Sequence, residues 1–394
     1  MQNNYPAKPP PTTTTTRLEA RQPAAGAALL FFVENDSLLV AREVFYPAHG
    51  WQRTDLSSKR IGQDRPGGRC SAFASALSVP VHGRAQSIHL ALVVTDADGD
   101  HLYLSLSNPA AKVGTGAAPA WVPYPFDAAP SARRLAIVKV QIGDAADRAF
   151  VVVDVLIDAD GAAPRPVRYW IDAGSAAGLQ AGPRWIEHTL PIENAGVYAS
   201  CLGRSRGGWD VDGVYLAGKV GKEAQLLYAP LYNPFNPMQP RWARRLEIPG
   251  KLAAESIAAC RNADNTSDLY ATAGGALYYF SATNQNEGAQ ALTLISAPAF
   301  ADVHTLFAAN TGGRVTVWGV NRAGQVICTS APQVYVADPA AWSAPGVILS
   351  NVAAIAPSPD GDGVDYAFFA HTPGGLVRVT KSPGDSRWIS TPIG

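Results

Sequence analysis

The chain has 394 residues, of which 47% are hydrophobic and 16% are charged. This length and composition predict a folded globular protein with room for a large core. The 32 basic and 32 acidic residues cancel, so the chain lacks the charge excess expected of proteins that bind nucleic acid or acidic membranes. No apolar run approaches the roughly 20 residues of a spanning helix, and no membrane span is predicted.

The N-terminal stretch MQNNYPAKPPPTTTTTRLEARQP has no positively charged region followed by an apolar segment. It is therefore not a standard secretory signal, and we expect a protein that is cytoplasmic or released by a non-classical route. Its Pro and Thr content predicts a flexible, disordered tail over residues 1–26. A single domain is predicted over residues 27–394.

From residue 29 onward, short apolar runs separated by Gly, Asn and Asp predict strands joined by tight turns. The first group holds three runs, and its innermost strand is either residues 17–21 or is replaced by another N-terminal stretch that joins the final sheet. Six groups of four runs follow. The seven groups start at residues 29, 69, 134, 196, 255, 304 and 352.

A tryptophan marks the last run of most groups, as a structural period would require. These residues are Trp51, Trp121, Trp185, Trp242, Trp342 and Trp388. Self-similarity with four strands per unit is the signature of a β-propeller. One such sheet cannot bury both of its faces, whereas sheets packed side by side around an axis can. The sequence therefore predicts an all-β, seven-bladed β-propeller of four-stranded antiparallel blades with a flexible N-terminal tail.

Metal and redox motifs are sparse. Four cysteines without CxxC spacing predict buried thiols, although their even number leaves a disulfide open. They are Cys70, Cys201, Cys260 and Cys328. Two Asp-rich turns carry alternating carboxylates, the oxygen ligands that Ca²⁺ prefers. Turn formation alone explains both turns, the one at Asp96, Asp98 and Asp100 and the one at Asp360, Asp362 and Asp365. Ca²⁺ is the one cofactor left open, at Asp360, Asp362 and Asp365.

Three outer strands begin with Arg-Trp, at residues 184–185, 241–242 and 387–388. Such pairs fit a sugar pocket, in which apolar sugar faces stack on aromatic rings while Arg donates hydrogen bonds to oxygens. They also fit packing between blades with Arg reaching water. No nucleophile elbow, phosphate loop or HExxH motif is present.

The segment GGRVTVWGVNRAGQVICTS, with Gly313-Arg314 and Trp318, resembles the repeats of tachylectin-like propeller lectins. The segments GLVRVTKSPGDSRW and PVRYWIDAGSAAGLQAGPRW are similar to the repeats of fungal fucose lectins, in which an Arg, a Glu and a Trp hold the sugar. The resemblance implies that Arg378 with Trp388, and Arg168 with Trp185, occupy the Arg and Trp places, while neither repeat carries the Glu.

The leading hypothesis is a non-catalytic, lectin-like propeller that binds a glycan between blades. A scaffold that binds a protein ligand or forms part of an assembly, with an oligomer possible, is the first alternative. A polysaccharide hydrolase or lyase with its site at the axial mouth is the second. The predicted ligand-binding residues, chosen by repeat position, are Arg168, Trp185, Arg241, Trp242, Arg314, Trp342, Arg378 and Trp388.

Overall fold

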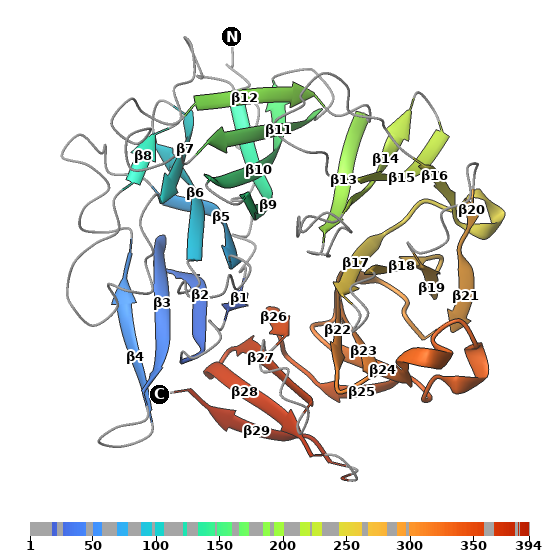
Figure 1. Cartoon of the computed structure of the whole chain (residues 1–394). Helices are drawn as coiled ribbons and strands as arrows, with labels where there is room; N and C mark the ends of the chain where they lie inside the picture. Colours follow the sequence, from blue (N-terminus) through green and yellow to red (C-terminus); the bar gives the residue numbers. More distant parts are fainter. Residues whose placement is uncertain are drawn as a thin grey trace, which may run out of the picture.

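The computed structural model of the chain shows an all-β architecture (Figure 1). The residues that it describes are 18–21, 27–44, 50–56, 69–77, 88–96, 99–105, 121–123, 133–145, 148–159, 165–172, 184–189, 193–200, 213–220, 223–230, 244–261, 267–281, 290–296, 299–357, 366–382, 385 and 387–393. Within these ranges, side-chain surroundings are described chiefly in the first sheet and the last three. No helix in these ranges is long and apolar enough to cross a membrane.

The described strands form seven separate sheets, named A to G here in chain order. Sheet A contains β1 (Leu18–Arg21), β2 (Leu29–Glu34), β3 (Ser37–Val44) and β4 (Gly50–Asp55). Sheet B contains β5 (Arg69–Leu77), β6 (Ile88–Asp96), β7 (Gly99–Ser105) and β8 (Trp121–Pro123). Sheet C contains β9 (Arg133–Ala145), β10 (Arg148–Ala159), β11 (Arg165–Asp172) and β12 (Arg184–Thr189).

The C-terminal half supplies the other four sheets. Sheet D contains β13 (Glu193–Ser200), β14 (Gly213–Val220), β15 (Glu223–Pro230), β16 (Arg244–Glu247) and β20 (Gln290–Ala291). Sheet E contains β17 (Ser256–Arg261), β18 (Ser267–Ala273), β19 (Ala276–Ser281) and β21 (Thr293–Ser296). Sheet F contains β22 (Val303–Thr311), β23 (Arg314–Asn321), β24 (Val326–Pro332) and β25 (Gly346–Leu349). Sheet G contains β26 (Ala354–Pro357), β27 (Tyr366–Thr372), β28 (Gly375–Lys381) and β29 (Ile389–Pro392).

The sheets are arranged radially, with the first strand of each near the centre and the last at the periphery (Figure 1). Neighbouring inner strands contact one another in chain order, and β26 of the last sheet contacts β1 of the first. Radial packing of small antiparallel sheets is the arrangement of a β-propeller. The prediction of an all-β protein built from small, mostly four-stranded antiparallel sheets is therefore confirmed.

Alternating side chains let each sheet bury both faces. In β2, Leu29 and Phe31 join a core cluster with sheet B, whereas Leu30 and Phe32 join a different cluster with sheet G. All four side chains are at most 2% exposed. Successive residues of a strand point to opposite faces, so a continuous apolar run is what a sheet covered on both sides requires. Further clusters fill the D–E, E–F and F–G junctions.

The innermost strand of sheet A is β1, which pairs with β2 from Leu18 opposite Phe32 to Arg21 opposite Leu29. This is the first of the two arrangements that the sequence left open. Because β1 lies before residue 27, the predicted boundary of the domain is too late, and residues 18–21 belong to the first sheet. The rest of the predicted tail lies outside the described residues.

Sheet D departs from the predicted four strands. Its fifth strand, β20, comes from the repeat that builds sheet E and runs parallel to β16. The Leu292 N–H then donates to the Glu247 carbonyl at 2.8 Å. The added strand pairs with the outer edge of sheet D, where backbone groups would otherwise remain unpaired.

Three segments that lead from one sheet into the next donate backbone hydrogen bonds to hairpin turns of the preceding sheet. The Cys70 N–H donates to the Asp36 carbonyl, the Phe300 N–H to Gly275 and the Val352 N–H to Gly324, at 2.8 to 3.0 Å. Asp36, Gly275 and Gly324 all have positive φ, which is the conformation that these turn residues were expected to adopt. Each turn therefore supplies an acceptor that fixes the start of the next sheet.

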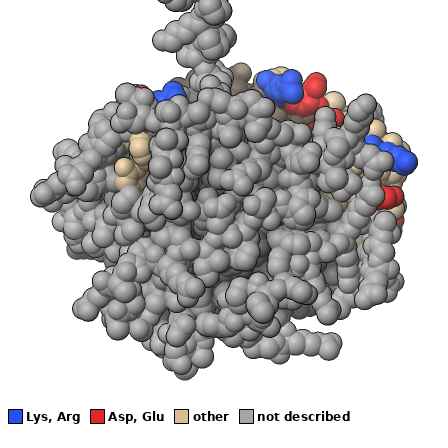
Figure 2. Space-filling view, turned by 90° about the horizontal axis from the view of Figure 1, so that it is seen from above, with Lys and Arg blue, Asp and Glu red and all other residues tan. Residues whose placement is uncertain are grey.

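Charged side chains of both signs reach the described surface. On the edge of the molecule shown in Figure 2, the described basic and acidic side chains lie interspersed. Three of the four cysteines, Cys70, Cys260 and Cys328, are free thiols, whereas Cys201 lies outside the described residues. Cys70 and Cys260 are buried, as predicted.

Candidate functional site

A pocket of about 760 Å³ lies between the outer halves of sheets F and G. Sheet F contributes the start of β23, the end of β24 and the approach to β25. Sheet G contributes the end of β28 and the residues that lead into β29. Its lining includes the side chains of Arg314, Thr316, Cys328, Ser330, Lys381, Asp385, Arg387 and Trp388.

Thr316 of β23 lines this pocket, and its hydroxyl has no hydrogen-bond partner in the described part of the chain. The residue is 2% exposed, and its Oγ1 is a buried polar atom without a partner among the described residues. A buried hydroxyl left unsatisfied costs about 1–3 kcal/mol. The residue lines the pocket, but its hydroxyl is closed to solvent, so a ligand would reach it and supply the missing hydrogen bond only after a neighbouring side chain moves.

Arg314 begins β23 and is held by sheet F. Its Nε donates to the Ser330 Oγ at 3.1 Å, and the strands β23 and β24 pair alongside this contact. Ser330 is itself fixed, because its N–H donates to the Ser343 Oγ at 3.0 Å and its carbonyl accepts from the Ser343 N–H at 2.9 Å. These bonds orient the guanidinium before any ligand binds.

Trp388 forms the aromatic wall on the side of sheet G. Its ring lies edge-on to Phe368 of β27, with centroids 5.6 Å apart and planes at 62°. The ammonium of Lys381 lies 5.9 Å from the centre of the Trp388 ring. Trp388 is only partly buried, so an aromatic surface remains available to a ligand.

Cys328 of β24 lines the same pocket but is not a nucleophile. Burial raises the pKa of its thiol to about 12, although the nearby cations of Lys381 and Arg314 act in the opposite direction. A thiolate is the reactive form of cysteine, and this side chain stays protonated at neutral pH. The pocket therefore offers hydrogen-bond donors, cations and an aromatic ring.

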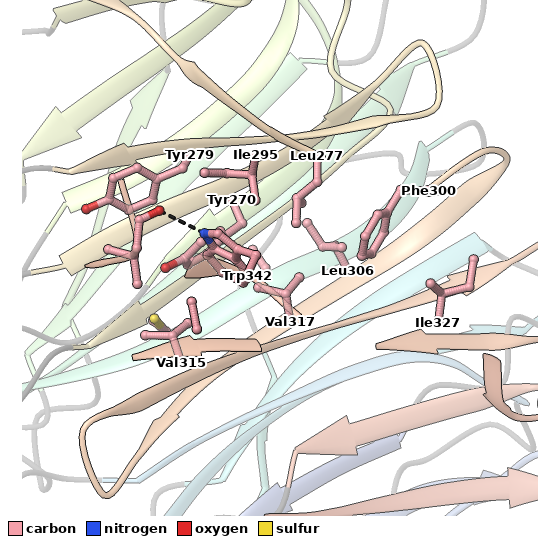
Figure 3. Close-up of a cluster of buried hydrophobic side chains, with 14 of the residues drawn as sticks. Tyr270, Leu277, Tyr279, Ile295, Phe300, Leu306, Val315, Val317, Ile327 and Trp342 are labelled. Atoms are coloured by element: carbon pink, nitrogen blue, oxygen red, sulfur yellow. Dashed lines mark hydrogen bonds between the residues drawn. The ribbon is translucent and has the colours of Figure 1, made fainter. Parts of the chain in front are cut away.

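The neighbouring E–F junction is filled where the F–G junction is open. Trp342 precedes β25 as Trp388 precedes β29, but it is 9% exposed and lies in the core cluster with Tyr270, 5.8 Å between ring centroids. Its Nε1 donates to the Val336 carbonyl at 2.9 Å (Figure 3).

The segment between β24 and β25 explains this filling. It contains the 3-10 helices η4 (Gln333–Tyr335) and η5 (Pro339–Ala341). The Gln333 N–H donates to the Gly313 carbonyl, and the Asp338 carboxylate accepts from the Ala340 N–H. These contacts hold Val336 against the cluster, where its carbonyl meets Trp342. Trp342 is thus a packing residue in this structure.

Arg378 lies on the face of sheet G that is turned away from the pocket. Its guanidinium is 6.0 Å from the centre of the Phe369 ring and 3.7 Å from the Glu43 carboxylate of sheet A. Trp388 packs with Phe368 on the opposite face. The structure therefore separates Arg378 from Trp388 and brings Trp388 together with Arg314 of the preceding repeat.

The remaining predicted residues lie in sheets C and D. Arg168 of β11 lies opposite His188 of β12 in the strand pairing, and Trp185 of β12 lies opposite Ile171 of β11. For these residues the structure describes the backbone alone. Arg241 and Trp242 lie outside the described residues, as do Asp360, Asp362 and Asp365. The described residues contain no group of three or more His, Cys, Asp or Glu placed to hold a metal ion.

Thr316, Ser330 and Lys381 were missed by the sequence analysis. Thr316 is two residues from Arg314 along β23 and therefore shares its face, which is the signal that could have found it. Lys381 ends β28 and belongs to the next repeat, so only the packing of two sheets brings it to the same pocket.

No family model matches the chain, and no curated protein matches it in sequence. Several solved structures are similar. A fucose lectin from Aleuria aurantia, described as a six-bladed β-propeller, is 12% identical with a TM-score of 0.40, over 97% of this chain and 96% of the lectin. An α-L-arabinanase from Penicillium chrysogenum is 13% identical with a TM-score of 0.42, over 78% and 89%.

A puromycin hydrolase is 14% identical with a TM-score of 0.50, over 96% of this chain and 53% of the hydrolase. At these identities the similarity concerns the fold alone. The similar structures include a fungal lectin propeller, as the repeats indicated. That lectin is described as six-bladed, whereas seven sheets are present among the described residues of this chain.

Proposed function

We propose that this protein is a seven-bladed β-propeller that binds carbohydrate without catalysis, and that the F–G pocket is its binding site. Seven sheets and the contact of β26 with β1 support seven blades in a closed ring. The observation that carries the binding proposal is the pocket-lining hydroxyl of Thr316, which is buried and has no partner among the described residues.

The surrounding groups suit a sugar. The Trp388 ring offers an apolar surface for the C–H face of a pyranose, and Arg314 offers N–H donors to ring and hydroxyl oxygens. Thr316 and Ser330 add hydroxyls that both donate and accept. The volume of about 760 Å³ falls in the usual range of small-ligand sites, about 300–1,000 Å³.

The difference between two junctions favours a dedicated site over identical sites in every repeat. Trp342 is buried by the segment with η4 and η5, whereas Trp388 remains partly exposed. A ligand at the F–G junction would therefore contact residues that the E–F junction does not offer. Linking several such chains would raise the avidity of weak single sites.

A glycan array tests the proposal, followed by titration calorimetry of the best ligand with pocket variants. Thr316→Val removes the hydroxyl while keeping the shape, and we expect about tenfold weaker binding. Arg314→Gln should weaken binding at least as much. Trp342→Phe, outside the pocket, is the matched aromatic control and should leave affinity unchanged.

The stability of the same variants separates a binding role from a structural one. Because Thr316→Val removes an unsatisfied buried hydroxyl, the free protein should be as stable as the parent or more so. A blank array, or a ligand whose affinity is the same in the parent, Thr316→Val and Arg314→Gln, would refute the proposed site.

A further inference from the structure

We propose that the glycan bound in the F–G pocket is acidic, with a carboxylate or sulfate group that lies between Arg314, Lys381 and Arg387. This inference rests on the proposed function, because it names the chemical class of ligand for the same site. It goes beyond that function by predicting which sugars the protein rejects.

Among the described residues that line the pocket, cations outnumber anions, although the charges of the whole chain cancel. Three cationic side chains line it, those of Arg314, Lys381 and Arg387, against the single carboxylate of Asp385. They come from both sheets, so cations line the pocket on both sides. Asp360, Asp362 and Asp365 precede β27 in the sequence, lie outside the described residues and do not enter this comparison.

The field of two of these cations reaches the buried wall of the pocket. Lys381 and Arg314 both act to lower the pKa of the Cys328 thiol, against the larger effect of burial. A side chain whose ionised form is favoured by both cations reports a positive potential at that place. An anionic group of a ligand would gain from the same potential.

Arg314 is also oriented for an anion. Its Nε donates a hydrogen bond to the Ser330 Oγ, and no other side-chain hydrogen bond of Arg314 is found among the described residues. A guanidinium carries five N–H donors in a rigid fork, so the two terminal nitrogens can still donate. Paired N–H donors of this kind match the oxygens of a carboxylate or a sulfate.

A neutral sugar would be less well served. Its hydroxyl protons need acceptors, and carboxylates are the strongest that a protein offers. In the described part of this pocket the only carboxylate is that of Asp385, and three cationic side chains outnumber it. Trp388 argues in turn for a sugar that carries the anion, since an inorganic anion would not use an aromatic wall.

Matched ligand pairs test the inference. Oligogalacturonate and its methyl ester share one sugar chain, and only the first carries free carboxylates; dextran sulfate and dextran likewise share one chain, and only the first carries sulfates. We expect the acidic member of at least one pair to bind about tenfold or more tightly than its neutral partner. Raising NaCl from about 50 to 300 mM should weaken the acidic ligand much more than the neutral one.

Charge-neutralising variants locate the effect. Lys381→Gln and Arg387→Gln should each weaken the acidic ligand about three- to tenfold and leave the neutral one nearly unchanged. Arg322→Gln is the matched control, because Arg322 is exposed at the far end of β23, roughly 25 Å from Arg314 at the usual rise per residue. Asp385→Asn should tighten the acidic ligand.

The outcomes separate the inference from the proposed function. If neutral glycans bind as tightly as acidic ones and Thr316→Val weakens both, the protein is a lectin and the acidic preference is wrong. If acidic ligands bind but Arg322→Gln costs as much as Lys381→Gln, the attraction is diffuse and the inference also fails. Binding of sulfate ion alone, with affinity equal to that of the sulfated glycan, would overturn both.

Discussion

The guanidinium of Arg378 in β28 lies 3.7 Å from the carboxylate of Glu43 in β3, measured from Nη1 to Oε1. This ion pair joins the last sheet to the first. The Glu43 side chain is 6% exposed and that of Arg378 is 30% exposed, so water screens the pair only in part. Nearby, Trp51 packs edge-on against Phe369 at 5.8 Å. Sheets A and G therefore meet through side chains.

Breaking this ion pair should destabilise the fold. In Glu43→Gln the Arg378 cation loses its counter-charge at a partly shielded place, and we expect the free energy of unfolding to fall by about 1–3 kcal/mol. Urea denaturation measures the change. In a double-mutant cycle with Arg378→Met, a coupling energy near zero would show that the pair contributes nothing. Glycan affinity should be unaffected.

Trp342 should matter for stability and not for binding. Trp342→Phe loses the hydrogen bond to the Val336 carbonyl, and we expect a loss of about 1–2 kcal/mol. Trp342→Ala also leaves a cavity in the E–F core and should cost about 3–5 kcal/mol. Thermal and urea unfolding give both values. A change in glycan affinity with unchanged stability would contradict this role.

The E–F core should weaken at alkaline pH. Burial, and next the charges of Cys260 and Asp268, raise the pKa of Tyr270, and burial with the charge of Asp268 raises that of Tyr279. The unfolded tyrosines ionise first, near pH 10, so the stability present below that pH is lost as pH rises. Each tyrosine contributes a slope of up to about 1.4 kcal/mol per pH unit.

Tyr279→Phe tests this dependence. The variant loses the hydrogen bond from Tyr279 to the Asp268 carboxylate at 3.1 Å and should be less stable at pH 8. Above pH 10 the free energy of unfolding should fall less steeply with pH than in the parent. The difference in slope should be up to about 1.4 kcal/mol per pH unit, which corresponds to one proton. Urea titrations between pH 8 and 11 give both slopes, and parallel slopes would mean that Tyr279 ionises normally.

Cys328 should resist alkylation although it lines a pocket. With a pKa of about 12, about one thiol in ten thousand is ionised at pH 8, and the reaction with iodoacetamide should be roughly a thousandfold slower than for an ordinary thiol. Peptide mapping after timed labelling measures the rate, with urea-unfolded protein as the control. A rate that does not rise between pH 8 and 10 would contradict the raised pKa.

The fold was readable from the sequence because its determinants are local. The glycine pairs at 274–275 and 312–313 do adopt positive φ, and the strands begin and end within a few residues of the predicted runs. The repeat predicted Trp342 and Trp388 within outer strands; Trp388 stands immediately before β29, and Trp342 lies four residues before the start of β25. Residues 290–291 were predicted as part of the last run of their own repeat, and the pairing of β20 with the edge of sheet D was missed because no local pattern records it.

The candidate site was harder to predict because it lies between repeats. The sequence likeness pairs Arg378 with Trp388 inside one repeat, but alternation along β28 turns Arg378 toward sheet A. Among the predicted arginines, the one that lines the same pocket as Trp388 is Arg314, from the repeat before. Likewise, Trp342 and Trp388 occupy the same place in the pattern, and only the packing of the segment with η4 and η5 makes one a core residue.

The side-chain joint between sheets A and G has an evolutionary consequence. Among the described residues, neither sheet borrows a strand from the other, so duplication or deletion of a whole repeat at this seam would leave every backbone ladder intact. An inserted repeat would need only apolar faces that pack against sheets A and G and a cationic side chain to pair with Glu43. Copy number in such a chain can drift by ordinary gene recombination, with selection acting on two facing surfaces.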